Sequence, residues 1–431
     1  MKLNSRSSHP NFFARQLFRS LSPLQQDHIR VVDGCLTHAF GNSGGKLSAT
    51  VVVHHPRFYR RTLLGGGLGA AEAWMDGDWT CDDLTTLIRI FIRNRHVIER
   101  MNSPRTWLSQ AWAHLKHLLR KNTRGQARHN IHEHYDLGND FFRLFLDESM
   151  SYSCGIFEQP DSSLEEASLS KMQRICLKLN LQPGDQLVEI GGGWGGLALH
   201  AAGKFGCQVS TTTISGEQFR HMKGRVEDAG LAGHVQVLEQ DYRDLEGKFD
   251  KLVSVEMIEA VGHEYFDTFF RKTSSLLRPD GLMLVQGIVI KDQFFAAHRH
   301  SADFIRQHIF PGGCLPSVTA LCESMTRASD LRLIHLEEIS DHYARTLRHW
   351  RKRFCACLDE VRELGYSERF IRKWDYYLRY CEAAFEERQV NVVQMLLAKP
   401  DCRLDPLAIQ LPTVQRSGKQ SISPVPHHQG I

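Results

Sequence analysis

The stretch LVEIGGGWGGLALHAA, residues 187–202, places five glycines and a tryptophan between an apolar run and an alanine- and leucine-rich segment. This order predicts a strand, a tight turn and a helix. Glycine lets the backbone of such a turn approach a ligand where any Cβ would collide. Gly191, Gly193 and Gly196 satisfy the G-x-G-x-x-G spacing that aims a helix N-terminus at a pyrophosphate, although this match alone is weak.

Strand-like apolar runs begin at this turn and alternate with helical patterns toward the end of the chain. They cover residues 186–190, 207–213, 235–239, 251–255, 282–290, 331–339 and 390–398. Apolar strands separated by helices are typical of a sheet with helices on both faces. The sequence therefore predicts an α/β fold with a doubly wound, seven-stranded sheet.

Composition divides the chain into four parts. Residues 1–100 mix short strand-like runs with a glycine-rich stretch that precedes a helical segment, and they predict a small α+β domain. Residues 101–128 are polar and basic, and we interpret them as a linker. We expect the sheet domain to span residues 129–400 and a mobile tail to span residues 401–431, because the tail has no periodicity.

The bulk numbers limit the class of protein. With 431 residues, 42% of them hydrophobic and 24% charged, the chain has an ordinary globular composition. Its 11 cysteines include no CxxC pair and fit reduced thiols, so we expect a cytoplasmic protein. No stretch approaches the roughly 18 to 20 uninterrupted apolar residues of a membrane-spanning helix, and the N-terminus lacks the apolar core of a signal peptide.

Positive charge is concentrated at the front of the chain. Residues 1–130 hold 19 Lys and Arg against 8 Asp and Glu, a net charge of +11, which leaves −7 for the remainder of the total of +4. NFFARQLFRSLS places Phe12, Phe13, Leu17 and Leu21 near one helical face. A basic amphipathic helix lies on an anionic membrane or packs into a core, and pattern alone favours the core. No helix-turn-helix, zinc-finger or RNA-binding signature supports nucleic acid as a partner.

An acidic residue distinguishes the glycine turn from a dinucleotide site. Glu189 lies inside the end of the strand, where nicotinamide sites carry apolar residues, and no acid ends the second strand about 20 residues further on. Both features disfavour an NAD-linked oxidoreductase. An acid here suits a ligand with a positively charged amine, such as the methionine part of S-adenosylmethionine. Groups suited to an adenosine follow the second and third strands: Thr213, Ser215, Gln218, Asp241 and Tyr242.

Longer motifs carry a family resemblance through residues 130–398. In chain order they are EHYDLGNDFFRLFLDESMSYSCGIF, LVEIGGGWGG, TTISGEQ, QDYRD, VSVEMIEAVG, IFPGGCLPS, HYARTLRHWRKRF and WDYYLRYCEAAFEERQVNVVQMLLA. In these motifs the chain resembles the cyclopropane-fatty-acyl-phospholipid synthase family, which includes the mycolic acid cyclopropane synthases. The resemblance implies a Rossmann-like, S-adenosylmethionine-dependent methyltransferase domain with helical inserts that cover a lipid. AEAWMDGDWTCDDL resembles the extra N-terminal domain of the members that act on phospholipids.

The resemblance also implies a reaction and its site. A methylene group passes from S-adenosylmethionine to the cis double bond of an unsaturated acyl chain in a phospholipid, which becomes a cyclopropane ring. Family members use a bound bicarbonate as the base, at positions that match Cys154, Glu259, the backbone at Ile288, and Tyr343. The resemblance and the loops together predict an S-adenosylmethionine site of Tyr152, Ser153, Glu189, Gly191, Gly192, Gly193, Trp194, Gly195, Thr213, Ser215, Gln218, Asp241 and Tyr242.

Some positions depart from the family pattern or compete for a role. Gln286 stands in the fifth strand where the best-known members carry histidine, and Ala260 follows Glu259 in place of a histidine. Glutamine binds an anion but does not titrate near neutral pH, which leaves a methyl-branched product open as an alternative. Glu256 competes with Glu259 for the role at the anion site, and its alternative role is that of an acidic residue at the start of a helix. Cys381 matches a cysteine regarded as catalytic in the family, but a thiol has no evident task here, so a structural role is the stronger alternative.

Other functions and partners remain as alternatives. Relatives in this fold methylate small amines, and a non-catalytic lipid-binding protein is a further alternative. His129, His132 and His134 resemble a metal cluster but lack partners at an established spacing, so we expect no metal. A phospholipid substrate shifts our interpretation of the basic front toward a membrane surface, which predicts a peripheral protein on the inner face of the membrane, monomeric or as a homodimer. Aromatic inserts at 294–310 and 370–385 would roof the sheet's carboxyl edge.

Overall fold

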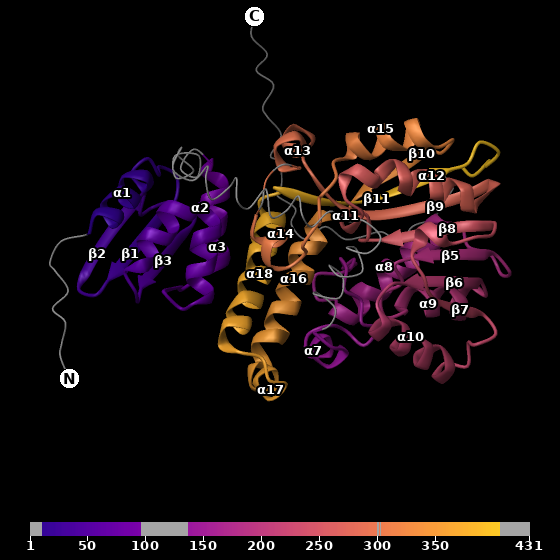
Figure 1. Cartoon of the computed structure of the whole chain (residues 1–431), viewed down its shortest axis with the longest axis horizontal. Coiled ribbons are helices and arrows are strands. Elements are labelled where there is room, and N and C mark those ends of the chain that lie inside the picture. Colours follow the sequence, from indigo (N-terminus) through magenta and orange to yellow (C-terminus); the bar gives the residue numbers. More distant parts are fainter. Residues whose placement is uncertain (1–10, 96–136, 300, 302, 406–431) are drawn as a thin grey trace, which may run out of the picture.

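The protein is described by a computed structural model that covers residues 11–95, 137–299, 301 and 303–405. The expected linker, the cluster of His129, His132 and His134, and residues 406–431 lie outside the described residues. Figure 1 shows a small sheet with its helices at one end and a larger sheet at the other. Two long helices, α16 (Ser340–Ala356) and α18 (Glu368–Glu386), lie between them.

The larger sheet contains every strand that the sequence predicts. Its strands are β5 (Gln186–Ile190), β6 (Gln208–Thr213), β7 (Val235–Glu239), β8 (Phe249–Val255), β9 (Leu277–Ile290), β10 (Arg332–Glu338) and β11 (Val390–Ala398). Their order is β10-β11-β9-β8-β5-β6-β7. Strands β5 to β9 are parallel, and β11 lies antiparallel between β9 and β10. The order reverses between β5 and β8, which is where ligands bind in open α/β sheets.

Helices cover both faces of this sheet, because neighbouring strand residues point to opposite sides. Leu187 belongs to a core cluster with α8 (Leu164–Lys178) and α9 (Gly196–Phe205). Its neighbour Val188 belongs to a second cluster with Phe269 of α12 (Phe266–Leu276). The first face is completed by α10 (Gly216–Asp228), and the second by α11 (Ile258–Val261) and α15 (Val318–Ala328). The predicted α/β fold is therefore confirmed.

Residues 11–95, which we call the N-terminal unit, form a second sheet of order β2-β1-β3-β4. Its elements are α1 (Phe12–Leu21), β1 (His28–Asp33), β2 (Leu36–Gly41), β3 (Ser48–Val53), α2 (Arg57–Met75), β4 (Trp79–Cys81) and α3 (Leu84–Arg93). Helix α2 begins before the glycine-rich stretch rather than after it, and Gly66, at φ 57°, kinks it. A Cβ at Gly69 would lie 2.1 Å from the Arg61 carbonyl oxygen, so the glycines permit this close passage.

Helix α1 packs its apolar face into the N-terminal unit, which corrects our interpretation of that face as a membrane-facing surface. Leu17 and Leu21 are buried, and Phe18 contacts Phe40 of β2 and Tyr59 of α2. Of the predicted apolar residues, Phe12 remains 54% exposed. The face is buried because the small sheet needs a helical cover on this side to form a core.

The positive charge of the chain's front lies only partly in the N-terminal unit. Residues 11–95 hold 10 Lys and Arg against 7 Asp and Glu, so most of the +11 belongs to residues outside the described ranges. Among the described residues, no helix is both long and apolar enough to cross a membrane.

The pair of α16 and α18, connected by α17 (Leu358–Glu363), packs on α7 (Asn139–Arg143) through aromatic rings. Trp374 of α18 lies with its ring centroid 5.0 Å from Phe141 and 6.1 Å from both Phe142 and Phe145. All four side chains are buried. This cluster holds the segment that precedes the larger sheet against the two long helices.

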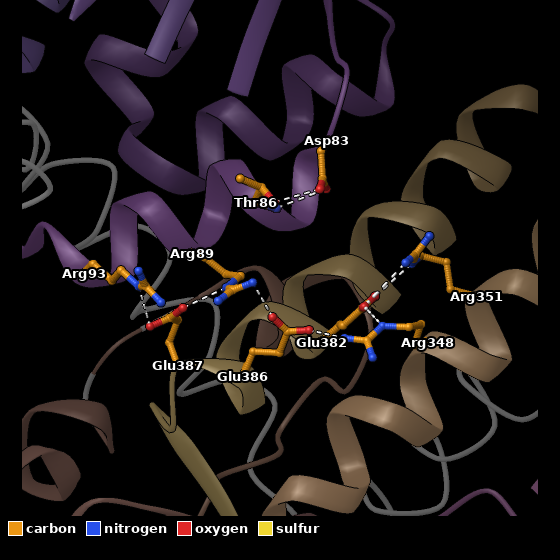
Figure 2. A network of polar contacts seen from close by, with 9 residues as sticks. All are labelled: Asp83, Thr86, Arg89, Arg93, Arg348, Arg351, Glu382, Glu386 and Glu387. Atoms are coloured by element: carbon orange, nitrogen blue, oxygen red, sulfur yellow. Dashed lines mark hydrogen bonds and ion pairs between the residues drawn. The ribbon is translucent and has the colours of Figure 1, made fainter. Parts of the chain in front are cut away.

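Helix α18 also contacts the N-terminal unit. Trp74 of α2 donates its indole N–H to the carbonyl oxygen of Arg372 at 3.1 Å. A chain of ion pairs, which we call the interface network, continues from α3 through α18 to α16 (Figure 2). It comprises Arg93–Glu387, Arg89–Glu387, Arg89–Glu386, Arg348–Glu386, Arg348–Glu382 and Arg351–Glu382. Helix α18 thus connects the N-terminal unit to the larger sheet, and α14 (Phe304–His308) adds further contacts with α2.

Candidate active site

A cavity of about 460 Å³ lies at the carboxyl ends of β5, β6, β8 and β9, beside the reversal of strand order. The residues that the sequence predicted and that line it are Tyr152, Ser153, Glu189, Gly191, Gly192, Gly193, Trp194, Thr213, Gln218, Asp241, Tyr242, Glu259, Ile288, Tyr343 and Cys381. Cys154, Gly195, Ser215 and Gln286 do not line it. The structure therefore brings together residues that are up to about 230 positions apart in the sequence.

The glycine turn passes tightly against the second strand. Gly191 and Gly193 have φ values of 83° and 55°, in the left-handed region that favours glycine. A Cβ on Gly192 would lie 2.0 Å from Thr211 Oγ1 and 2.9 Å from Glu189 Oε2. The turn therefore needs glycine both for its conformation and for the close approach of its backbone.

Two neighbours in this turn have packing roles. Gly195 precedes α9 at φ 87°, and a Cβ there would lie 2.6 Å from the side chain of Met222. Trp194 lines the cavity and donates its indole N–H to Asn139 Oδ1 at 2.7 Å. This hydrogen bond joins the glycine turn to α7.

Glu189 and Lys171 place an acidic and a basic side chain on the wall of the cavity. Glu189 is buried and accepts a hydrogen bond from Thr211 Oγ1 at 2.6 Å. Burial raises its pKa to about 7, although Thr211 and Lys171 oppose the shift. Lys171 of α8, which no sequence motif indicated, donates to Ser153 Oγ at 2.8 Å, and burial lowers its pKa. A carboxyl and an ammonium group on one wall suit a ligand that carries an amine and a carboxylate.

The polar groups after β6 bond mainly to one another. Thr213 Oγ1 donates to Gln218 Oε1 at 2.8 Å, and the backbone N–H of Gln218 donates to Ser215 Oγ at 3.3 Å. Ser215 is thereby the N-cap of α10. Thr213 and Gln218 face the cavity, whereas Ser215 stabilises the helix behind it.

The acid after β7 is held by its neighbour. Arg243 donates to both carboxylate oxygens of Asp241, from Nε at 2.8 Å and from Nη2 at 2.6 Å. Tyr242 lies with its ring 5.7 Å from that of Phe269 in an edge-on arrangement, and burial raises its pKa to about 12. Asp241 is therefore a carboxylate that Arg243 fixes on the wall of the cavity.

Three groups from distant parts of the chain donate to the carboxylate of Glu256. The backbone N–H of Cys154 lies 2.9 Å from Oε1, Gln286 Nε2 lies 2.8 Å from the same oxygen, and Tyr343 Oη lies 2.6 Å from Oε2. Cys154, Gln286 and Tyr343 were predicted to surround a bound anion. Glu256, which we had weighed as a helix-start acid, lies at their centre, and α11 begins after it at Ile258 without a side-chain cap.

The amide of Gln286 belongs to a buried polar chain that crosses to the next strand. Its Oε1 accepts from Gln394 Nε2 of β11 at 2.8 Å, and Gln394 Oε1 accepts from Lys178 Nζ at 2.7 Å. Lys178 also pairs with Glu337 of β10 at 2.5 Å. Gln286 therefore uses both ends of its amide within the protein.

Glu259 lies next to Glu256 but has different partners. Its Oε1 accepts a short hydrogen bond from the backbone N–H of Ile288, which the sequence analysis expected to face an anion. Its Oε2 is buried and has no hydrogen-bond partner in the described residues. Burial, followed by the charge of Glu256, raises the pKa of Glu259 to about 8. Near neutral pH this carboxyl is therefore protonated.

The two cysteines that the sequence motifs indicated both have thiols whose surroundings favour the neutral form. The thiol of Cys154 is fully buried, and burial raises its pKa well above the ordinary value. Cys381 of α18 lines the cavity, and burial raises its pKa strongly as well. Because the thiolate is the nucleophilic form of cysteine, neither side chain is poised to attack.

The aromatic inserts supply apolar walls to the cavity. The insert at 294–310 contributes Ile305 of α14 (Phe304–His308), Phe310, and His298 of α13 (Asp292–His298). Tyr377, Tyr380 and Phe385 of α18 come from the second. Across residues 11–95, 137–299, 301 and 303–405, no cluster of three His, Cys, Asp or Glu side chains could hold a metal ion.

A sheet of this order, with a glycine turn after its first strand and an acid inside that strand, defines the class of S-adenosylmethionine-dependent methyltransferases. Among solved structures, the mycolic acid cyclopropane synthase CmaA1 complexed with SAH and CTAB is 32% identical, with a TM-score of 0.60 over 63% of this chain and 98% of that one.

Comparison with known sequences identifies the family. The model of the mycolic acid cyclopropane synthetase family matches residues 122–395. The cyclopropane-fatty-acyl-phospholipid synthase of Escherichia coli (strain K12) is 36% identical over 370 residues, 86% of this chain and 93% of that protein. The tuberculostearic acid methyltransferase of Mycobacterium tuberculosis is also 36% identical, over 81% of this chain and 83% of that protein. The chain therefore belongs to the mycolic acid cyclopropane synthetase family, as its motifs predicted, and is an S-adenosylmethionine-dependent methyltransferase.

Proposed function

We propose that this enzyme transfers a one-carbon group from S-adenosylmethionine to the cis double bond of an unsaturated phospholipid acyl chain and closes a cyclopropane ring. The observation that carries the proposal is a single cavity with both charged and hydrocarbon-like walls. Its apolar side chains include Ile288, Ile305, Phe310, Leu347 and Phe385. An acyl chain requires such walls, because it offers no hydrogen bonds. Each polar group of the protein that it covered would lose its partner, at about 1–3 kcal/mol of binding free energy.

The polar wall fits the donor. Glu189 and Lys171 match the amine and carboxylate of an amino acid, and the glycine turn lets the protein backbone approach a ligand closely. Asp241 offers lone pairs to the exocyclic amine of an adenine, and Tyr242 offers a flat apolar surface. When bound, S-adenosylmethionine supplies an electrophilic methyl group on sulfur. The surrounding residues hold this group in line with the alkene and exclude water that would otherwise add to a cation.

Bicarbonate, which the family resemblance implies as the base, does not fit the donors that would bind it. The N–H of Cys154, the amide of Gln286 and the hydroxyl of Tyr343 all donate to Glu256, and the N–H of Ile288 donates to Glu259. A second anion at the same point would meet the charge of Glu256 without these donors. We therefore assign no step to bicarbonate in this enzyme.

A methyl-branched acyl product is the second candidate. The chain is 36% identical both to a cyclopropane-fatty-acyl-phospholipid synthase and to a tuberculostearic acid methyltransferase. Both outcomes begin with the same methyl transfer to an alkene and differ in which proton leaves the cation. The product is therefore determined by the position of the base relative to the acyl chain.

We also propose that the enzyme works on the inner face of a membrane, where the phospholipids are, with the N-terminal unit of the expected domain 1–100 turned toward the lipid. Exposed Arg15, Arg19, Arg30 and Arg60 support attraction to anionic headgroups. The buried face of α1 gives no support to insertion. The fraction of the full chain that sediments with phosphatidylglycerol vesicles should fall as the salt concentration rises. An equal fraction bound to neutral vesicles would contradict the proposal.

The test of function uses the purified full chain, S-adenosylmethionine and vesicles of an oleoyl phosphatidylglycerol. Mass spectrometry of the released fatty acids should show the gain of one CH₂ per modified chain. Gas chromatography against standards then separates the cyclopropane from a methyl-branched olefin. Methylation of soluble amines without any change in the lipid would contradict the proposal and favour a small-molecule methyltransferase.

A further inference from the structure

We propose that Glu256 is the general base of this enzyme, a side chain that replaces the bound anion implied by the family resemblance. The inference rests on the proposed methyl transfer to an alkene and names the group that completes it. It follows from the placement of one carboxylate at the meeting point of three donors on the cavity wall.

The three donors come from separate elements that enclose Glu256. Cys154 lies in the loop before α8, Gln286 in the middle of β9, and Tyr343 on α16. Their distances to the carboxylate oxygens are 2.9, 2.8 and 2.6 Å, all within the range of good hydrogen bonds. Donors of this kind stabilise a carboxylate in its ionised form. They hold a negative charge on the wall of the cavity where the cation would form.

The backbone of Glu256 carries a second, independent sign of function. Its φ is 50°, in the left-handed region that non-glycine residues rarely adopt. Such strain persists only where the surroundings fix it, and it is common at active sites. A helix-start role does not explain the strain, because Met257 is the N-cap of α11 and no side chain caps that helix. The strained conformation turns the side chain toward Cys154, Gln286 and Tyr343.

Glu256 and Glu259 divide the charge between them. Glu256 receives three hydrogen bonds from the described residues, whereas Glu259 receives one, from Ile288. Two adjacent buried carboxyls cannot both ionise easily, so the one that accepts more hydrogen bonds keeps the charge. The charge of Glu256 in turn raises the pKa of Glu259. Burial raises the pKa of Glu256 as well, and the hydrogen bonds from Tyr343, Cys154 and Gln286 oppose that shift. The number of donors therefore favours Glu256 as the ionised member of the pair and Glu259 as the neutral one.

With Glu256 as the base, every bond and proton of the ring closure is accounted for. The π electrons of the alkene form a bond to the methyl carbon while the bond from that carbon to sulfur breaks, and S-adenosylhomocysteine keeps the electron pair. The neighbouring alkene carbon becomes a cation. Glu256 Oε2, which accepts one hydrogen bond from Tyr343, then takes a proton from the new methyl group. The C–H electrons close the three-membered ring, and the proton leaves later to solvent.

Gln286 is a positioning residue in this arrangement. It cannot titrate, and Gln394 and Lys178 fix its amide from behind. Its Nε2 is thereby held toward Glu256 Oε1.

The decisive variants are Glu256→Gln and Glu256→Gly. Glu256→Gln keeps the shape but loses the base, so turnover on oleoyl vesicles should fall by about 10²- to 10⁴-fold. Binding of S-adenosylhomocysteine should stay within about threefold of wild type, because the donor wall is untouched. Glu256→Gly relieves the left-handed φ and exposes the three donors, so added bicarbonate or formate should restore activity in a saturable way. Glu338→Gln, on the exposed end of β10, is the matched control and should behave as wild type.

The outcomes separate this inference from the proposed function. Wild-type activity that is unchanged in carbonate-free buffer, with Glu256→Gly rescued by a small anion, supports the inference. Wild-type activity that disappears in carbonate-free buffer and returns with bicarbonate overturns it. Glu256→Gln with near wild-type turnover overturns it as well, while the proposed function stands. A wild type that modifies no acyl chain overturns the proposed function and the inference together.

Discussion

Replacement of Glu387 by alanine should loosen the contact between the N-terminal unit and α18. Glu387 receives Arg89 Nε at 2.7 Å and Arg93 Nε at 2.8 Å from α3, as Figure 2 shows. The exposed fractions are 12% for Glu387, 23% for Arg89 and 31% for Arg93. Both pairs are therefore partly shielded from water and from salt. Removal of the carboxylate leaves two guanidinium groups without this partner.

The magnitude follows from this partial burial. Hydrogen bonds to charged groups contribute about 1.5–3 kcal/mol when shielded, and exposed ion pairs about 0.2–1 kcal/mol, so each pair here contributes about 1 kcal/mol. An acid at the C-terminal end of a helix costs a few tenths of a kcal/mol, which alanine recovers. We therefore expect Glu387→Ala to lower the free energy of unfolding by about 1.7 kcal/mol, a factor of about 18 in the equilibrium constant.

Urea unfolding followed by circular dichroism measures this loss, because urea, unlike guanidinium, does not screen charge. A double-mutant cycle with Arg93→Ala should give a coupling of about 1 kcal/mol. The ion pairs lower the pKa of Glu387 against the opposing effect of burial. The loss should therefore be present above about pH 4.5 and disappear as the pH falls further. Asp359→Ala, which removes an exposed pair with Arg362, is the control. A loss no larger than that of the control would refute the reasoning.

Three further predictions follow from packing and burial. Gly192→Ala should weaken binding of S-adenosylhomocysteine at least about tenfold in calorimetry, because its Cβ would lie 2.0 Å from Thr211 Oγ1. Gly203→Ala is the control and should bind as wild type, because the atom nearest its Cβ would lie 3.8 Å away. Glu259 has a pKa raised to about 8, so its neutral form stabilises the fold and that stability is lost as the pH rises through about 8. Unfolding free energies should consequently fall more steeply between about pH 4.5 and pH 8 for wild type than for Glu259→Gln, and parallel curves across that range would contradict the shift. Trp374→Ala should lower the free energy of unfolding by about 3–5 kcal/mol in the same urea assay, because the ring is buried in the aromatic cluster. Phe12→Ala, at an exposed position, should lower it by less than about 1 kcal/mol. Equal losses would show that the aromatic cluster does not stabilise the fold.

The sequence predicted the part of the site that depends on local order. Each strand of the larger sheet is an apolar run bounded by polar residues, and parallel strands bring their carboxyl ends to one edge. Glu189, the glycine turn, Thr213 and Asp241 follow directly from this rule, because each lies at or just beyond the end of a strand. The motif resemblance added Tyr343 and Ile288, which no local pattern identifies.

The amino-acid sequence by itself determined the seven strands, the glycine turn and the class of ligand, because backbone periodicity and steric limits act between near neighbours. Only the tertiary structure decided which acid is held by Cys154, Gln286 and Tyr343, and it selected Glu256 over Glu259. It also decided that Lys171 reaches the cavity and that the apolar face of α1 is buried. Burial and hydrogen-bond partners arise between elements that are far apart in the chain, so patterns within any one element do not contain them.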